Sequence, residues 1–551
     1  MSADLAILNA AIRTMDPASP TAEALAIANG KITAVGTSGF IRKLCDAETR
    51  VIDAQAATVL PGFVESHMHL FLGAFSQKVL QLADVTGTEQ ITSAIRDFTE
   101  SNPDEPLLIV QGVAYGCLDD GADPTRYDLD AICTDRPLLL QSADFHNAWV
   151  NTAALEAADV LHGRDVGPGS AIVLDSDGVA TGLLTEPPAV ATVLTLGRHG
   201  GREGLGLKGA EPEGPVNAAD RAADLALLCE GLAYCAAQGI TTIINMDGNL
   251  YQADLLKEIE DAGDLICRVE LPYHFTPGKP LENVEIAEKK RRDLTSDKLW
   301  CGRIKLFMDG VLDMETAYRV QDYPGKPGYK GEPLHKPERF VELATEFDRR
   351  GFQISVHAIG DGAVRTVLDG YEAARNANGA RDSRHRVEHI ELIDPSDLPR
   401  LTELGVVASV MPPHPPGCEF PLEPTATIIG VDDWPNAYLW RGLQQAGAPI
   451  CFSSDWPIAS LAPLTGITYV MNRTPFGDGL GDERLSFEDT LAAYTSGGAY
   501  AVLKDDQLGR IAAGYRADIV MFDRELTATN TEQTQVVLTI CDGTITHEIS
   551  A

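Results

Sequence analysis

The chain has 551 residues, enough for three or four ordinary domains or for one large barrel with smaller additions. Its 80 acidic side chains outnumber 44 basic ones, leaving a net charge of −36. This balance argues against nucleic acid or an anionic membrane as a partner, because phosphates are repelled at long range. With 44% hydrophobic and 23% charged residues, the composition is that of a globular enzyme and excludes a disordered chain.

Cysteine usage and the N-terminal residues bear on the cell compartment. The ten cysteines are scattered without a C-x-x-C pair, which indicates small buried residues in a reducing compartment. The first residues carry no basic segment followed by an apolar one, and no run approaches the roughly 18 apolar residues of a membrane helix. We therefore expect a cytoplasmic protein.

Both ends of the chain alternate short apolar bursts with turn signals. At the N-terminus, residues 5–8, 24–27 and 32–35 are apolar, and Asn29-Gly30 between the last two predicts a hairpin. Residues 517–522 and 536–540 have the same character. The two ends therefore predict one composite β-sandwich domain, formed by residues 1–60 plus 505–551.

The middle of the chain alternates strand-like runs with helical patterns, which predicts an α/β fold with a parallel sheet, open or closed into a barrel. The strand-like runs are residues 241–244, 303–307, 352–356, 386–390, 406–410 and 449–452, and helical patterns cover 218–238, 337–350 and 363–377. We assign residues 61–504 to this domain. An insertion at about 100–215 holds its own hairpin, 171–174 with 182–184, and a glycine-rich stretch.

A His-x-His pair follows the strand-like residues 57–60, in PGFVESHMH at residues 61–69. Residues two apart in an extended segment face the same side, so His67 and His69 would point at one metal ion. Imidazole suits zinc and its neighbours. The alternative is two half-exposed histidines at the end of a strand.

Three further candidate ligands stand at the ends of predicted strands. His357 and His389 each stand at the end of a strand-like run, and Asp455 follows another. In a barrel of parallel strands these ends converge on one face. Each residue alone could be structural, but together they are hard to explain as core filling, because buried polar groups need partners.

Lys305 lies within an apolar strand, where an unpaired charge is costly. One interpretation is a buried ion pair with Asp309 or Asp313. In the other, desolvation keeps the amine neutral enough to react with carbon dioxide, and the two carbamate oxygens then bridge two cations.

Several motifs in order resemble the metal-dependent amidohydrolase superfamily, in the branch of the N-substituted formamide deformylases and the YtcJ-like hydrolases (amidohydrolase family 3). The resemblance covers nearly the whole chain. Its motifs are VLPGF at 59–63 with His67-Met68-His69, DFHNAWVN at 144–151, KLFMDG at 305–310, HAIGD at 357–361, RVEH at 386–389, SSDWP at 453–457 and ADIV at 517–520.

The resemblance implies a (β/α)8 TIM-like barrel with a β-sandwich made by both chain ends. It implies that His67 and His69 bind a first metal ion, that His357 and His389 bind a second, and that carboxylated Lys305 bridges this binuclear centre. Asp455 would touch the first ion and shuttle a proton. A metal-bridged hydroxide would then hydrolyse a non-peptide carbon–nitrogen bond, in an amide or N-substituted formamide of a small organic molecule.

Substrate contacts are less sharply indicated. Asp144 and His146 share one strand face and could line the pocket, although packing is an equal alternative. His414, in PPHPP at 412–416, could contact substrate, although a rigid loop with an exposed imidazole is the simpler interpretation. Glu186 is an alternative bridging carboxylate if Lys305 stays unmodified.

The sequence thus predicts an amidohydrolase with one or two divalent metal ions, zinc being expected, and with N6-carboxylysine at Lys305. Its partner would be a small-molecule amide, and we expect a homo-oligomer, a dimer. Two alternatives stay open: a mononuclear deaminase-type amidohydrolase, which usually lacks the strand-four lysine, and a non-catalytic barrel scaffold, which would have lost ligands.

Overall fold

The computed structural model describes residues 2–83, 85–119, 121–142, 146–167 and 169–549. Its contacts divide the chain into two compact units. Unit 1 comprises Met1–Leu70, Gly206–Glu211 and Leu228–Ala551, and unit 2 comprises Phe71–Leu205 and Pro212–Leu227.

Unit 1 contains a ring of parallel strands. Two of its strands are interrupted, one between β16 and β17 and the other between β18 and β19. These interruptions divide the ring into the sheets β18-β16-β15-β8 and β17-β19-β20-β21-β22-β23. The strands are β8 (Phe63–Met68), β15 (Ile240–Asn245), β16 (Arg268–Glu270), β17 (Tyr273–His274), β18 (Leu299–Trp300), β19 (Arg303–Phe307), β20 (Gln353–Ala358), β21 (Arg386–His389), β22 (Val407–Val410) and β23 (Ile450–Phe452).

The segment after β23 closes the ring against β8. The Asp455 N–H donates to the carbonyl of His67 at 2.9 Å, and the His69 N–H donates to the carbonyl of Trp456 at 2.8 Å. Since β8 also pairs with β15, both neighbours of β8 are fixed by backbone hydrogen bonds. The α/β barrel expected from the sequence is confirmed.

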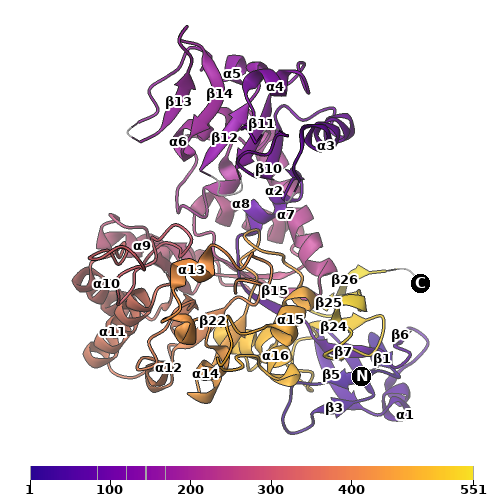
Figure 1. Cartoon of the computed structure of the whole chain (residues 1–551). Helices are drawn as coiled ribbons and strands as arrows, with labels where there is room; N and C mark the ends of the chain where they lie inside the picture. The colour runs from indigo at the N-terminus through magenta and orange to yellow at the C-terminus, as the bar shows by residue number, and fades with distance from the viewer. Residues whose placement is uncertain (1, 84, 120, 143–145, 168, 550–551) are drawn as a thin grey trace. The chain divides into compact units, whose positions relative to one another are not determined.

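Helices of unit 1 alternate with these strands (Figure 1). In α10, Pro337 occupies the first turn, and Phe340, Leu343, Ala344 and Phe347 are buried at helical spacing. The bounds of these helices are α8 (Leu250–Ala262), α9 (Val284–Asp293), α10 (Pro337–Arg349), α11 (Asp361–Asn378), α12 (Leu398–Leu404), α13 (Thr425–Ile429), α14 (Trp440–Gln445), α15 (Pro463–Asn472), α16 (Phe487–Tyr494) and α17 (Ser496–Ala501).

The chain ends build two further sheets of unit 1, in the orders β5-β4-β1-β6 and β26-β25-β24-β7-β2-β3, and Figure 1 places β24 beside β7. Buried Ile7, Ile27, Val59, Ile519 and Leu538 join both sheets in one apolar core. The strands are β1 (Leu5–Leu8), β2 (Ala11–Arg13), β3 (Thr21–Ala22), β4 (Ala24–Ala28), β5 (Lys31–Gly36), β6 (Arg50–Asp53), β7 (Thr58–Pro61), β24 (Ile519–Phe522), β25 (Val536–Cys541) and β26 (Thr544–Glu548), with α1 (Ser38–Ile41).

The predicted hairpin turn joins β4 to β5. Asn29 and Gly30 both have positive φ, 52° and 74°, as a two-residue turn between twisted strands requires. The exact boundaries of a composite domain, 1–60 plus 505–551, and of a barrel domain, 61–504, stay predictions.

Unit 2 has a core of its own around buried Trp149, Leu108 and Leu140. Its sheet has the order β13-β14-β12-β11-β10-β9, with the predicted hairpin as β13 and β14. Its elements are β9 (Leu80–Gln81), β10 (Leu108–Val113), β11 (Leu138–Ser142), β12 (Asn147–Val150), β13 (Ala171–Leu174), β14 (Ala180–Thr185), α3 (Thr88–Ser101), α4 (Arg126–Asp130), α5 (Thr152–Ala157) and α6 (Pro187–Leu194); α2 (Leu70–Ser76) and α7 (Ala218–Ala237) contain residues of both units.

Among the described residues, no helix combines the length and the apolar character needed to cross a membrane.

A buried ion cluster links the barrel to the terminal strands. Arg268 on β16 is 1% exposed, and its guanidinium donates to Asp518 at 2.7 and 3.1 Å and to Asp542 at 2.8 Å. Asp518 immediately precedes β24, so the cluster fixes a C-terminal strand to a barrel strand.

Replacing Arg268 with methionine should lower the free energy of unfolding by about 3–5 kcal/mol, because the carboxylate of Asp518 stays buried without its cation. Denaturant unfolding measures this loss. As a control, Arg524→Met removes an exposed pair with Asp523 and should cost less than about 1 kcal/mol. Equal stability of the two variants would contradict a structural role for the cluster.

Candidate metal centre

His67 and His69 lie at the carboxyl end of β8, and one carboxylate faces both rings. The Nε2 atoms of His67 and His69 are each 3.3 Å from Oδ1 of Asp455. All three side chains are buried. The two imidazoles thus converge on one point, as their spacing of two residues predicts.

A second carboxylate holds the far side of each ring. Nδ1 of His67 lies 2.9 Å from Oε2 of Glu388, and Nδ1 of His69 lies 2.9 Å from Oδ1 of Asp247. If these carboxylates accept Nδ1–H, each Nε2 keeps its lone pair directed at Asp455. Glu388 in turn accepts two 2.8 Å hydrogen bonds from Arg386, which fixes its orientation.

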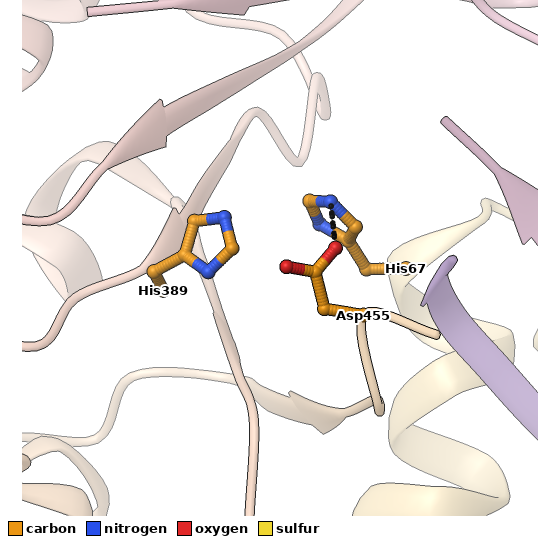
Figure 2. Close-up of side chains that lie close together, drawn as sticks. All are labelled: His67, His389 and Asp455. Carbon is orange, nitrogen blue, oxygen red and sulfur yellow. Dashed lines mark ion pairs between the residues drawn. The ribbon is translucent and has the colours of Figure 1, made fainter. Parts of the chain in front are cut away.

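His389 faces the same point from β21. Figure 2 shows His67, His389 and Asp455 directed toward one another, and their donor atoms all lie within 4.8 Å. His389 and Asp455 have φ of 76° and 62°, in the left-handed region that such residues seldom occupy. These two backbone turns sit where strand geometry ends and the connecting segments begin, a placement typical of functional sites.

His357, at the end of β20, completes the row of imidazoles. Its ring centroid is 4.4 Å from that of His389 and 4.7 Å from that of Phe307. Its Nε2 lies 3.0 Å from the carbonyl oxygen of Gly310, which can only accept, so Nε2 carries the proton and Nδ1 keeps the lone pair.

Lys305 on β19 is fully buried, with Nζ 3.5 Å from Nε2 of His67. Burial lowers its pKa to about 8, although Glu388 and Asp455 act in the opposite direction. The ion pairs considered for it from the sequence are not found in the described part of the chain. Asp309 accepts backbone N–H groups of Tyr318, Ile359 and Gly360, and Asp313 accepts the hydroxyl of Thr425.

Burial sets the protonation of the imidazoles. It lowers the pKa of His67 to about 4 and that of His357 to about 3, with Lys305 adding to both shifts, and it lowers the pKa of His389 well below its usual value. For His69 burial acts in the same direction, but its hydrogen bond to Asp247 and the negative charge of nearby Asp455 outweigh it and raise the pKa to about 9. Three of the four rings are therefore neutral at pH 7, the form that binds metal ions.

Buried atoms without hydrogen-bond partners mark the place where a cation fits. They include Oδ1 of Asp455, Nδ1 of His389 and Nε2 of His414. Buried polar atoms nearly always have partners, so this set calls for a ligand. Imidazole nitrogens with a carboxylate are donors that zinc and its neighbours accept.

A cavity of about 300 Å³ opens beside these residues. Its lining includes the imidazoles of all four histidines predicted as ligands, together with Asp455, His414 and a wall of apolar side chains. Cavities of this size with a few convergent polar groups are typical of small-molecule sites.

His414 lines this cavity, and the expectation of an exposed imidazole is wrong. Only 8% of its side chain is exposed, because it stacks on His389 with ring centroids 5.7 Å apart. Its Nδ1 lies 3.3 Å from Oε1 of Glu391, and its Nε2 lies 3.9 Å from Oδ2 of Asp455. The donor atoms of His389, Glu391 and His414 form a second group within 4.8 Å.

The other predicted residues belong to unit 2. Asp144 lies outside the described residues. Nδ1 of His146 is 2.9 Å from Oε2 of Glu186, so the residue considered as an alternative bridging carboxylate bonds a residue considered for substrate binding.

Sequence reasoning missed Asp247, Glu388 and Glu391. Asp247 follows β15 by two residues, and Glu391 follows β21 by two, so both stand where barrel strands end, the same signal that identified His357 and Asp455. Glu388 is next to His389 on one strand, and strand alternation would have pointed it away. The left-handed backbone at His389 removes that alternation.

Comparison with known proteins agrees with this geometry. A family model described as amidohydrolase family matches residues 50–547. The chain belongs to the amidohydrolase family. It is therefore an enzyme, a metal-dependent hydrolase that acts on carbon–nitrogen bonds.

Relatives of this amidohydrolase match it over nearly their full length. YtcJ of Bacillus subtilis is 28% identical over 98% of both chains, and N-substituted formamide deformylase of Arthrobacter pascens is 26% identical over 99% of this chain and 98% of its own. A crystal structure of a metal-dependent hydrolase from Pyrococcus furiosus is 25% identical, with a TM-score of 0.73 over 94% of this chain and 99% of that one.

Asp247→Asn should weaken metal binding by about 10- to 100-fold, because the substitution removes the carboxylate that orients His69 and raises the basicity of its Nε2. Titration of metal-depleted protein with zinc measures the dissociation constant. Asp254→Asn, an exposed position on α8, is the matched control. An unchanged constant in Asp247→Asn would show that His69 needs no such partner.

Proposed function

We propose that this amidohydrolase hydrolyses an amide or N-substituted formamide of a small organic molecule. The observation that carries the proposal is the Asp455 carboxylate, which lies 3.3 Å from the Nε2 atoms of both His67 and His69 and beside His389. The full-length similarity to N-substituted formamide deformylase supports the substrate class.

In this proposal two divalent ions would occupy the site, and zinc is the metal that we expect. His67, His69 and Asp455 would hold one ion, and His357 and His389 would hold the other. Lys305, carboxylated on Nζ, would bridge them; its burial and lowered pKa favour the neutral amine that reacts with carbon dioxide. Such ions polarise a carbonyl and make water a competent nucleophile near neutral pH.

The chain's own residues then handle the proton and the substrate. Asp455 would take the proton of the attacking water on its carboxylate and deliver it to the departing nitrogen, which lets a poor amine leave. His414, held through Nδ1 by Glu391 and against His389, presents Nε2 to the cavity as a substrate contact. With substrate in the cavity, the apolar wall would shield the scissile bond from bulk water. Roles for Asp144 and His146, and assembly as a homodimer, stay predictions.

Metal content tests the bridging role of Lys305. Purified wild type should hold about two transition-metal ions per chain, and Lys305→Ala should hold far fewer, because the bridge is lost. Elemental analysis measures this, with exposed Lys208→Ala as the control. Labelling with ¹³C-bicarbonate should give a carbamate resonance in wild type and none in Lys305→Ala. One ion per chain with no carbamate signal would favour a mononuclear deaminase-type site.

Asp455→Asn tests the proton transfer. We expect kcat on an N-substituted formamide to fall by about 10²- to 10⁴-fold, because the amide cannot accept the water's proton. Metal content is measured on the same samples, which separates loss of a ligand from loss of the base. Wild type that binds metal yet hydrolyses no member of a broad amide panel would favour a non-catalytic scaffold.

A further inference from the structure

The cavity beside the metal centre has two chemically different parts. The imidazoles and Asp455 form its inner end, whereas seven apolar side chains contribute to the rest, those of Leu207, Phe307, Val311, Leu312, Ile359, Phe420 and Ile458. Val311 and Ile458 are 40% and 46% exposed, so this part of the wall is open to solvent. The part of a substrate beyond the scissile bond therefore meets a mainly apolar wall.

The formal charges along this wall have one sign. Among the residues that the structure describes, the lining contains no lysine or arginine, and its carboxylates beyond the candidate metal centre are Glu391 and Asp313. Glu391 contacts Nδ1 of His414, and a protonated His414 ring would balance the charge of the Glu391 carboxylate. Lys305 is fully buried beneath the imidazoles, and Lys208, next to Leu207 along the chain, is not part of the lining.

Asp313 is the carboxylate of this wall that is open to a ligand. It lies in the segment between β19 and α10 and is exposed, and it accepts a hydrogen bond from the hydroxyl of Thr425, the first residue of α13. Because Thr425 also lines the cavity, this bond fixes the carboxylate at the cavity wall. One carboxylate oxygen engaged by a hydroxyl leaves the other free to accept from a ligand.

We propose that the cavity selects amides whose substituent is apolar and ends in a neutral or ammonium group, that it rejects those ending in a carboxylate, and that Asp313 sets this charge preference. The inference rests on the proposed amide hydrolysis and deepens it. A carboxylate would be desolvated against apolar walls and near Asp313 without a cationic partner. An ammonium would instead find an anionic partner in the carboxylate of Asp313. The net charge of −36 acts in the same direction during encounter.

Three matched ligands test the preference: N-substituted formamides that share one phenyl ring and carry a para methyl, aminomethyl or carboxylate group. For wild type, kcat/KM should rank aminomethyl at or above methyl, and both at least about fivefold above carboxylate, since one unscreened charge contact at a wet surface is worth this much. Added salt should narrow the gap. Dissociation constants of the three corresponding amines, measured by calorimetry, should follow the same order.

Variants at Asp313 assign the preference to this residue. In Asp313→Asn the ratio of kcat/KM between aminomethyl and carboxylate compounds should fall several-fold, and in Asp313→Lys it should invert. Asp432→Asn, an exposed carboxylate outside the lining, should leave the ratio unchanged.

The outcomes separate the two proposals. Turnover of the methyl compound with a ratio near one in wild type, or a ratio that Asp313→Lys does not alter, would overturn the charge preference and leave amide hydrolysis standing. If no formamide is turned over, amide hydrolysis of this class fails, and the calorimetric order of the three amines still decides whether Asp313 selects charge.

Discussion

The structure of the site depends on one carboxylate shared by two imidazoles. Asp455 lies at equal distance from the Nε2 atoms of His67 and His69, and each of those rings is turned toward it by a second carboxylate on its far side. The resulting chain of carboxylate, imidazole and carboxylate aims the lone pair of neutral His67 and the negative charge of Asp455 at one small volume. Such an arrangement is costly in a dry interior unless a cation shares it.

The barrel is what brings these groups together. His67 and Glu388 are 321 positions apart, and His69 and Asp247 are 178 apart, yet each pair meets within hydrogen-bond distance. Their meeting requires the ring to close, and the backbone bonds from Asp455 to His67 and from His69 to Trp456 close it at the site itself. The carboxylate that we propose as the proton carrier therefore lies in the same segment that closes the ring.

Much of this could be predicted from the sequence because the signals are local. Apolar runs of strand length located the barrel strands, and polar residues at the ends of those runs located His357, His389 and Asp455. Lysine inside an apolar strand was conspicuous for the same reason. Which ring each carboxylate supports was not predictable, because the pairing of His69 with Asp247 and of His67 with Glu388 depends on the register of distant strands. The left-handed backbones of His389 and Asp455 were also hidden, since nothing in the residue type announces them.

The imidazoles stand on or directly after barrel strands, whereas most of the apolar wall stands on the connecting segments that follow them. In the proposed function, chemistry and selectivity are thus carried by parts of the chain under different constraints. A connecting segment can exchange a leucine for a serine without moving a strand, so the range of molecules accepted can drift while the ionic centre stays intact. Proteins that share these imidazoles and this carboxylate need not share a substrate. Substitutions in the connecting segments alone can change which substrate the enzyme accepts.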